Sequence, residues 1–307
     1  EPVFLWVHYI DPHVPYAPPP ELARAFDPGY EGRYAERFGG EPGATGPLAF
    51  PADLPKREAI YRNPLPEPVN EHVRKLYAAD VRATDAAIEA LVRGLEDAGG
   101  PWSLVFTADH GESLGEHDYF WEHGDYVLEG TVRVPLAFLL PEGDPLRRPR
   151  RHDVWASLVD VMPTLVELFD LPVPYDLAYG IEGRSLAPVL RGEALPERPV
   201  FAESGHSHHP EEVRGRVRFD VAGRFRAVYR DRWKLVWTPF QTPDREWALY
   251  DVEADPGETR NLYRPDHPEV PALREALSAW LRDSDDATAT ALDARDVELL
   301  RSLGYVE

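Results

Sequence analysis

Hydrophobic side chains recur at helical spacing between residues 69 and 98 and predict the clearest helix of the chain. Gly99 and Gly100 follow directly and are expected to end it. Asp80 falls on the same apolar stripe, so it would require a polar partner if it is buried. A second apolar helix is expected over residues 157–171, with Pro163 in its first turn or at a kink.

Short apolar runs alternate with these helices and predict buried strands. They cover residues 3–9, 102–106 and 136–140. Helices that alternate with buried strands are typical of a doubly wound α/β fold, in which helices cover both faces of a parallel sheet. We therefore expect an α/β domain over residues 1–195.

The pattern changes after about residue 196, where short aromatic-rich runs replace the longer elements. Strands are expected at 225–229, 233–237 and 247–250, and helices at 270–281 and 292–303. Short strands separated by tight turns favour a small antiparallel sheet. Residues 196–307 are thus predicted to form a smaller α+β domain of antiparallel strands and helices.

The composition narrows the choice of partners. The chain has 307 residues and a formal charge of −21, which disfavours a nucleic-acid partner because no basic stripe offsets the acid. It contains no cysteine, which excludes disulfides and thiolate zinc sites. No apolar run is long enough to cross a bilayer, and no signal peptide is recognisable. The sequence indicates neither a compartment nor an oligomeric state.

The candidate chemistry lies where the second predicted strand ends, in the run Asp109-His110-Gly111-Glu112. Polar groups at the carboxyl end of a parallel strand lie where α/β sheets bind ligands. An adjacent Asp and His can offer one oxygen and one nitrogen to a metal ion. Taken alone, the tripeptide Asp-His-Gly is more often a solvated turn.

Further histidines and acids follow the first and second predicted strands. Together they favour a functional site over a solvated turn. His8, Asp11 and His13 accompany the first strand, and His117 and His123 follow the second. In a doubly wound sheet these loops share one edge. We expect the side chains to converge on a site for a divalent cation and an oxyanion.

At this level the chain resembles the sulfatase family of the alkaline-phosphatase-like superfamily, nearly from end to end. The matching segments, in chain order, are 4–20, 106–112, 115–117, 123–135, 159–164, 182–186, 232–235, 249–256 and 303–305. The resemblance implies an enzyme that hydrolyses a sulfate ester of a small molecule or glycan to an alcohol and sulfate. It also identifies the α/β domain as the C-terminal part of the family's catalytic domain.

The resemblance assigns roles to four residues. Asp109 and His110 would bind the divalent cation, Ca²⁺ or alternatively Mg²⁺, although many relatives have Asn where His110 stands. His13 would contact the sulfate or the leaving-group oxygen. His123 occupies the place of a Lys or His that holds a sulfate oxygen and assists departure of the alcohol.

Five more residues are assigned to the surroundings of the site, where they would shape the pocket or contact substrate. They are His8, Asp11, Glu112, His117 and Arg133. For Arg133 a structural ion pair is favoured over a catalytic role. The histidine-rich run 205–209 is expected to be a solvated loop at the pocket rim rather than a metal site.

The family's nucleophile is missing from this sequence. It is a formylglycine, made from Cys or Ser in a motif that lies ahead of the matching segments, and the chain has no cysteine. We therefore expect a fragment that is inactive alone. Two alternatives remain: a phosphodiesterase or phosphonate monoester hydrolase of the same superfamily, and a non-catalytic binding protein descended from the enzyme.

Overall fold

The computed structural model describes residues 3–39, 65–173, 180–207, 224–238 and 246–285. They fall into two compact units. The first contains the described residues up to Gly100 together with residues 112–122, and the second contains residues 101–111 and the described residues from His123 onward. Each unit is described by itself.

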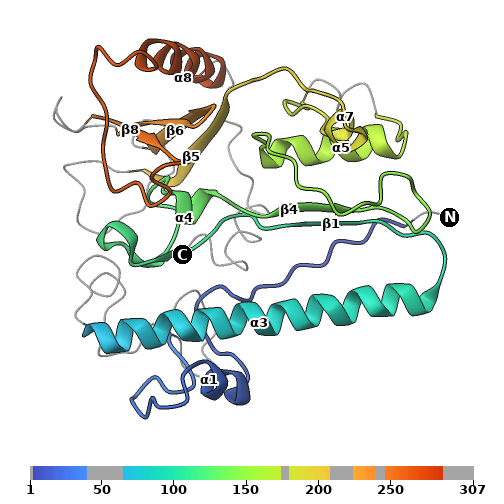
Figure 1. Cartoon of the computed structure of the whole chain (residues 1–307), viewed down its shortest axis with the longest axis vertical. Helices are drawn as coiled ribbons and strands as arrows, with labels where there is room; N and C mark the ends of the chain where they lie inside the picture. The colour runs from blue at the N-terminus through green and yellow to red at the C-terminus, as the bar shows by residue number, and fades with distance from the viewer. Residues whose placement is uncertain (1–2, 40–64, 174–179, 208–223, 239–245, 286–307) are drawn as a thin grey trace, which may run out of the picture. The chain divides into compact units, whose positions relative to one another are not determined.

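The first unit is built on the long helix α3, Glu67–Ala98 (Figure 1). The predicted helix is thus confirmed, and Gly99 ends it with a φ of 71°. The short helix α1, Pro20–Phe26, packs against α3. Asp80 is buried as anticipated, and its carboxylate accepts a hydrogen bond from the N–H of Ala17 at 2.8 Å.

A small hairpin and an aromatic cluster complete the first unit. Strands β2, Ser113–Leu114, and β3, Phe120–Glu122, pair in antiparallel fashion around the 3₁₀ turn η1, Glu116–Asp118. Buried Trp121 meets the rings of Tyr16 and Phe38 edge-on, with centroids 6.2 and 5.4 Å apart. These rings fill the space that the helix stripe alone does not cover.

The strand predicted over residues 3–9 is wrong in this structure. Residues 3–10 have no regular secondary structure, and Val3, Phe4, Leu5 and Trp6 are between 66% and 86% exposed. A strand exists only when a neighbour satisfies its backbone groups. In the described part of the chain no strand pairs with this segment.

The second unit begins with β1, Leu104–Thr107, which pairs with β4, Leu136–Leu139. Both predicted strands are confirmed, but they run antiparallel, so the parallel pairing assumed for this edge is corrected. Between them lies the one-turn helix α4, Glu129–Val132.

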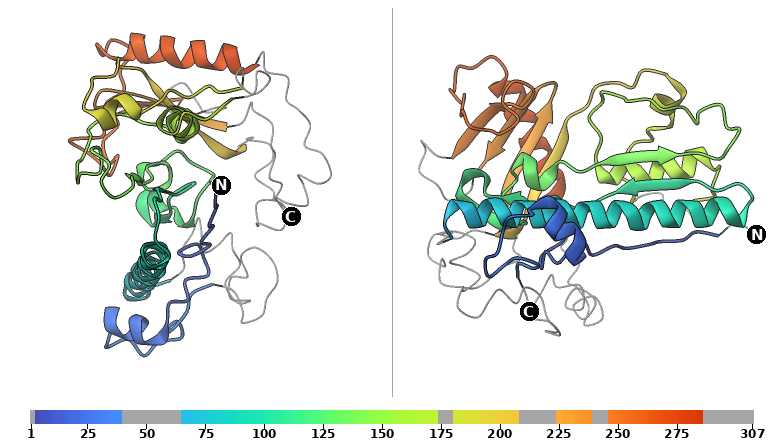
Figure 2. Two further views of the ribbon diagram at one scale, coloured as in Figure 1. Left: turned by 90° about the vertical axis from the view of Figure 1, so that its right-hand side faces the viewer. Right: turned by 60° about the horizontal axis from the view of Figure 1, so that its bottom comes forward.

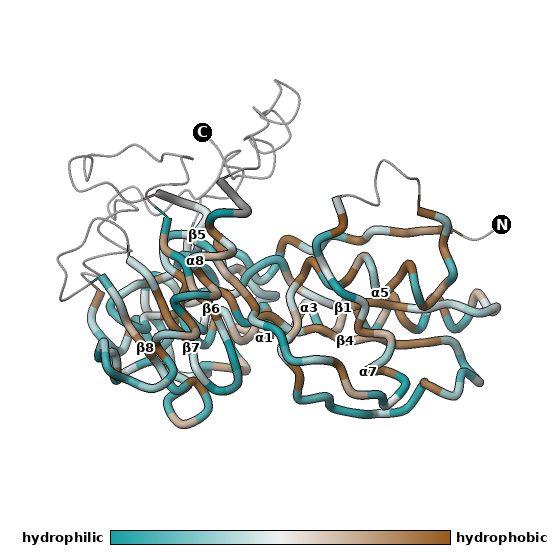
Figure 3. Tube along the Cα trace, turned by 90° about the horizontal axis from the view of Figure 1, so that it is seen from above, coloured by the Kyte–Doolittle hydropathy of each residue, from teal (hydrophilic) through white to brown (hydrophobic). Residues whose placement is uncertain are grey.

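Two short helices accompany these strands in the second unit. The 3₁₀ turn η2, Leu158–Asp160, leads into α5, Val161–Leu168, and α7, Ala187–Arg191, packs against α5. Pro163 lies in the first turn of α5, where its missing N–H costs nothing. Hydrophobic positions run along β4 and α5 (Figure 3).

A four-stranded antiparallel sheet forms the C-terminal part of the second unit. Its strands are β5, Val200–Ser207, β6, Arg224–Arg230, β7, Trp233–Trp237, and β8, Trp247–Asp251, in that order. The helix α8, Val270–Asp285, lies along one face (Figure 2). The three aromatic-rich strands and the first C-terminal helix are confirmed, whereas residues 292–303 lie outside the described residues.

Side chains alternate across this sheet and bury both of its faces. Val228, Leu235 and Leu249 pack against α8, together with Val270, Leu273 and Leu277 of that helix. Ala227, Tyr229 and Val236 point to the other face, where they meet Val127 and Trp155. The predicted α/β fold with a smaller C-terminal antiparallel sheet is therefore confirmed.

Candidate functional site

The turn after β1 carries the candidate site, and each end of the turn is held by a hydrogen bond to a backbone carbonyl. The Thr107 hydroxyl donates a hydrogen bond to the carbonyl of Pro135 at 2.8 Å. The N–H of Gly111 donates to the carbonyl of Thr131, also at 2.8 Å. A Cβ on Gly111 would lie 2.1 Å from the carbonyl oxygen of Gly130, so only glycine permits this close approach.

Asp109 and His110 present an oxygen and a nitrogen to the same place. The N–H of His110 donates to Asp109 Oδ1 at 3.0 Å, and its ring Nδ1 lies 2.8 Å from the carbonyl oxygen of Gly111. Because a carbonyl only accepts, Nδ1 carries the proton. The other nitrogen, Nε2, lies 3.6 Å from Asp109 Oδ2. The two atoms are close enough to ligate one cation.

His123 joins this pair from a segment that follows β3. Its ring stacks on that of His110, with centroids 3.6 Å apart and planes 17° from parallel. The Asp109 side chain is 58% exposed and that of His110 26%, so solvent reaches the cluster. The structure thus brings together Asp109, His110 and His123, three of the four residues to which the resemblance assigns a direct role.

The fourth, His13, belongs to the first unit. Its Nδ1 lies 2.6 Å from the carbonyl oxygen of Val14 and therefore donates to it. His8 and Asp11 are exposed in the same unit. That these three side chains meet His110 and His123 stays a prediction.

Glu112 and His117 also lie in the first unit, in different surroundings. Glu112 is buried and accepts a hydrogen bond from the Tyr16 hydroxyl at 3.0 Å. Burial, and then the Glu112 carboxylate, raise the pKa of Tyr16 well above its ordinary value. Glu112 thus lies inside an aromatic core. His117 is exposed on η1 with a left-handed φ of 55°.

Arg133 directly follows the last residue of α4 and lies shortly before β4. Its guanidinium Nη1 is 3.7 Å from Glu129 Oε2, and the Arg133 side chain is 57% exposed. This geometry supplies the structural ion pair that the sequence favoured at Arg133.

The donor set fits part of a metal site. Asp109 and His110 provide two donors of the types that divalent cations accept. Among the residues that the structure describes, no three His, Cys, Asp or Glu side chains gather so that they could hold a metal ion. If Asp109 and His110 bind a hard cation, which takes six or more oxygen ligands, further ligands would be needed.

One carboxyl group has properties that the sequence did not assign to function. Burial raises the pKa of Asp80 to about 7, the Asp11 carboxylate adds to this, and the Ala17 hydrogen bond opposes it. A carboxyl that titrates near neutrality is typical of functional sites as well as of strained cores. The only signal in the sequence was an acid on an apolar helix stripe.

Two family models match the chain and together span most of it. The model described as Sulfatase matches residues 1–171, and the one described as N-sulphoglucosamine sulphohydrolase, C-terminal, matches residues 115–286. The chain belongs to the sulfatase family.

Individual relatives agree with this assignment. The Delta 4,5-hexuronate-2-O-sulfatase of Bacteroides thetaiotaomicron is 30% identical over 228 residues, which cover 73% of this chain and 43% of the relative. The human N-sulphoglucosamine sulphohydrolase is 26% identical, over 95% of this chain and 63% of its own length. The chain thus spans less than two thirds of these relatives.

Solved structures show the same fold. A structure in complex with its substrate D-glucosamine-2-N,6-O-disulfate has a TM-score of 0.52 at 25% identity, covering 73% of this chain and 43% of that one. The phosphonate monoester hydrolase of Silicibacter pomeroyi has a TM-score of 0.56 at 23% identity, covering 74% and 44%. No helix in the described ranges is long and apolar enough to cross a membrane.

Proposed function

We propose that this chain forms part of a sulfatase that hydrolyses a sulfate ester to an alcohol and inorganic sulfate. The observation that carries the proposal is the cluster of Asp109, His110 and His123 at the end of β1. The resemblance assigns these residues to the motif that binds metal and sulfate in the family, and their proximity in the second unit supports that assignment. Family membership supports the reaction class.

In this proposal Asp109 and His110 are ligands of the divalent cation, with Ca²⁺ expected and Mg²⁺ as the alternative. The bound cation would supply positive charge to the sulfate oxygens. The proton on Nδ1 of His110 holds the ring against Gly111, and Nε2, on the side of Asp109, is the nitrogen proposed to bind the cation. The orientation of this ring is therefore set by the turn itself.

His123 and His13 are proposed as the groups that assist the reaction. An imidazole that donates a hydrogen bond to the leaving oxygen lowers the barrier to departure of the alcohol. His123 is held for this role by its stack on His110. His8, Asp11 and His117 are proposed to shape the pocket. Glu112 would act through its contact with Tyr16.

The nucleophile is proposed to lie in residues outside this chain. No cysteine is present to become formylglycine. The coverage of the relatives, 43% for the hexuronate sulfatase, points the same way.

We further propose that the substrate is a sulfated glycan. The names of two relatives support this class, the hexuronate sulfatase and an N-acetylglucosamine-6-O-sulfatase of Bacteroides thetaiotaomicron that is 27% identical. The glucosamine disulfate complex of a structural neighbour also agrees. The acidic chain itself, at −21, would repel a polyanion unless local cations oppose it.

The test compares this chain with the longer protein from the complete reading frame. Release of sulfate from an aryl sulfate is measured for both, with Ca²⁺ present. We expect turnover by the longer protein only. Turnover by this chain, purified free of other sulfatases, would contradict the missing nucleophile, and none by either would favour the non-catalytic binding protein.

A second candidate, phosphonate monoester or phosphodiester hydrolysis, is favoured by one observation. The phosphonate monoester hydrolase neighbour shares the fold with a TM-score of 0.56, within the range of the sulfatase neighbours, 0.52 to 0.57. Tetrahedral oxyanions of sulfur and phosphorus place similar demands on a cationic site. The same assay with a phenyl phosphonate ester and an aryl phosphodiester separates the two, because the preferred ester is hydrolysed with the higher kcat/KM.

A further inference from the structure

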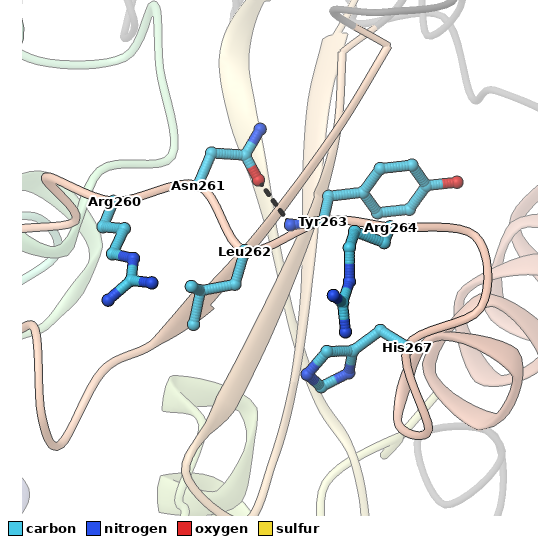
Figure 4. A pocket seen from close by; sticks show the side chains of 6 residues that line it. All are labelled: Arg260, Asn261, Leu262, Tyr263, Arg264 and His267. Carbon is cyan, nitrogen blue, oxygen red and sulfur yellow. Dashed lines mark hydrogen bonds between the residues drawn. The ribbon is translucent and has the colours of Figure 1, made fainter.

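The loop between β8 and α8 surrounds a surface cavity that no part of the proposed reaction uses. The cavity has a volume of about 340 Å³. It is lined by Arg260, Asn261, Leu262, Tyr263, Arg264 and His267 (Figure 4). None of these residues belongs to the candidate site.

The backbone of this loop is held in place by side-chain hydrogen bonds. The Asp255 carboxylate accepts the N–H of Arg260 at 2.9 Å. The side-chain oxygen of Asn261 accepts the N–H groups of Leu249 and Tyr263 at 3.0 and 2.9 Å, which ties the loop to β8. A cavity whose walls are already ordered binds a ligand at a lower entropic cost.

Three side chains of the cavity can donate hydrogen bonds to an anion. Arg260 and Arg264 are exposed, and Figure 4 shows the guanidinium of Arg264 beside the ring of His267. The Nδ1 of His267 lies 3.3 Å from the N–H of Glu269 and accepts from it, so a neutral ring carries its proton on Nε2. Asp266 is 3.8 Å from Arg264 Nε, but both are largely exposed, which makes the pair weak.

The ring of His267 is also fixed by an aromatic neighbour. It meets the indole of Trp233 edge-on, with centroids 4.9 Å apart. Tyr263 stacks on Trp247, with ring planes 17° from parallel. Beside the cations, Leu262 and Tyr263 provide apolar wall. Two guanidinium groups with an imidazole donor and apolar surface suit a ring that carries an oxyanion substituent.

We propose that this cavity binds a sulfo group of a sulfated saccharide, as a second binding site apart from the candidate catalytic residues. Arg264 and His267, which lie side by side in Figure 4, donate to the sulfo oxygens. Arg260, on the other side of Leu262, adds positive charge, and Leu262 and Tyr263 contact the sugar ring. The cavity then provides the local positive charge that an acidic protein needs to hold a polyanion. The proposal concerns binding alone and does not depend on whether sulfate esters are hydrolysed.

The test is equilibrium binding of a sulfated hexasaccharide of the heparin type, measured by calorimetry at low and at physiological salt. The double variant Arg260→Gln/Arg264→Gln is compared with Arg148→Gln/Arg282→Gln, which removes the same charge from two exposed arginines outside the cavity. We expect the first to weaken binding about tenfold or more, since hydrogen bonds to charged groups are lost, and the second to change it less than about twofold.

The other outcomes decide against the proposal in distinct ways. Equal weakening by both double variants would mean unspecific attraction. Equal affinity for the desulfated hexasaccharide would show that the cavity does not recognise the sulfo group. Inorganic sulfate that binds as tightly as the hexasaccharide would assign the cavity to the free ion. Hydrolysis of a small aryl sulfate by the longer protein is unchanged in the cavity variant, which separates this inference from the proposed reaction.

Discussion

The buried carboxylate of Asp160 accepts a hydrogen bond from the backbone N–H of Arg184, 24 residues later, at 2.9 Å. Its second oxygen, Oδ2, accepts the N–H of Ser157 at 3.0 Å, and the guanidinium of Arg198 pairs with the first oxygen, Oδ1. Asp160 is 0% exposed, so its carboxylate depends on these protein groups rather than on water. One side chain thereby joins three separate stretches of the second unit.

Asp160→Asn should destabilise the protein by about 2 to 4 kcal/mol, because the amide NH₂ that replaces one oxygen then faces a donor in a buried place. The free energy of unfolding in urea measures this. Asp153→Asn, whose side chain is 82% exposed, is the matched control and should change it by less than about 0.5 kcal/mol. Equal effects of the two variants would contradict the role of Asp160.

Lys234 is enclosed by two acids in the C-terminal sheet. Its Nζ lies 2.6 Å from Glu258 Oε1 and 3.3 Å from Glu129 Oε1, and it donates to the carbonyl of Val127 at 2.5 Å. Lys234 is 0% exposed, and both acids are buried. The two carboxylates are buried away from water and would repel each other. The ammonium group of Lys234 compensates this repulsion.

Lys234→Met should cost about 3 to 5 kcal/mol of stability, since it leaves buried charge without its partner. Lys75→Met is the control: Lys75 pairs with Asp27 at 3.2 Å but is 37% exposed, so its loss should cost about 1 kcal/mol or less. Thermal and urea unfolding of the two variants check the difference. A loss at Lys234 no larger than that at Lys75 would show that the buried pair contributes little.

Asp80 should make stability depend on pH. Its folded pKa of about 7 lies above the ordinary 3.8, so the neutral carboxyl stabilises the fold at low pH, and this contribution is lost as pH rises through about 7. Asp80→Asn keeps an acceptor for Ala17 and removes the ionisation. The variant should become more stable than the parent, by a margin that grows by roughly 2 kcal/mol between pH 5.5 and 8.5.

The pH range for this measurement stays above the isoelectric point of about 4.9, where solubility is lowest. Asp85→Asn, on the same helix with a 71% exposed side chain, is the control and should show a margin that does not vary with pH. If the stability difference between Asp80→Asn and the parent were also independent of pH, Asp80 would be ionised over the whole pH range measured.

Helix α3 and strand β7 could be predicted because their own residues determine them. The stripe of α3 is periodic over many turns, and the apolar and aromatic run 233–237 matches β7 in both bounds. Strand β5 was not predicted, because residues 200–207 include Glu, Gly and three other polar positions, and its pairing with β6 gives it order. For residues 3–9 the apolar run was visible, but a strand also needs a neighbour.

Asp109 and His110 were singled out as site candidates because polar groups interrupt an apolar run. His123, 13 residues after His110, was named from the family resemblance, and its ring stacks on that of His110. Glu112 has the same signal, yet it is buried against Tyr16, and nothing local distinguishes the two cases. The contacts of Asp160 depend on residues far along the chain, which a spacing argument does not reach.

A calcium titration separates the roles of His110 and His123, which lie ring to ring with centroids 3.6 Å apart. In the longer protein, Asp109→Ala and His110→Ala should each weaken Ca²⁺ binding by about tenfold or more, because each removes a ligand. His123→Ala should leave Ca²⁺ affinity within about twofold while sulfate-ester hydrolysis falls by about a hundredfold. His152→Ala, which alters a histidine outside the cluster, should change neither measurement. If His123→Ala weakens Ca²⁺ as much as His110→Ala does, the separation of a metal ligand from a sulfate-binding imidazole is wrong, because both rings would then serve the same ion.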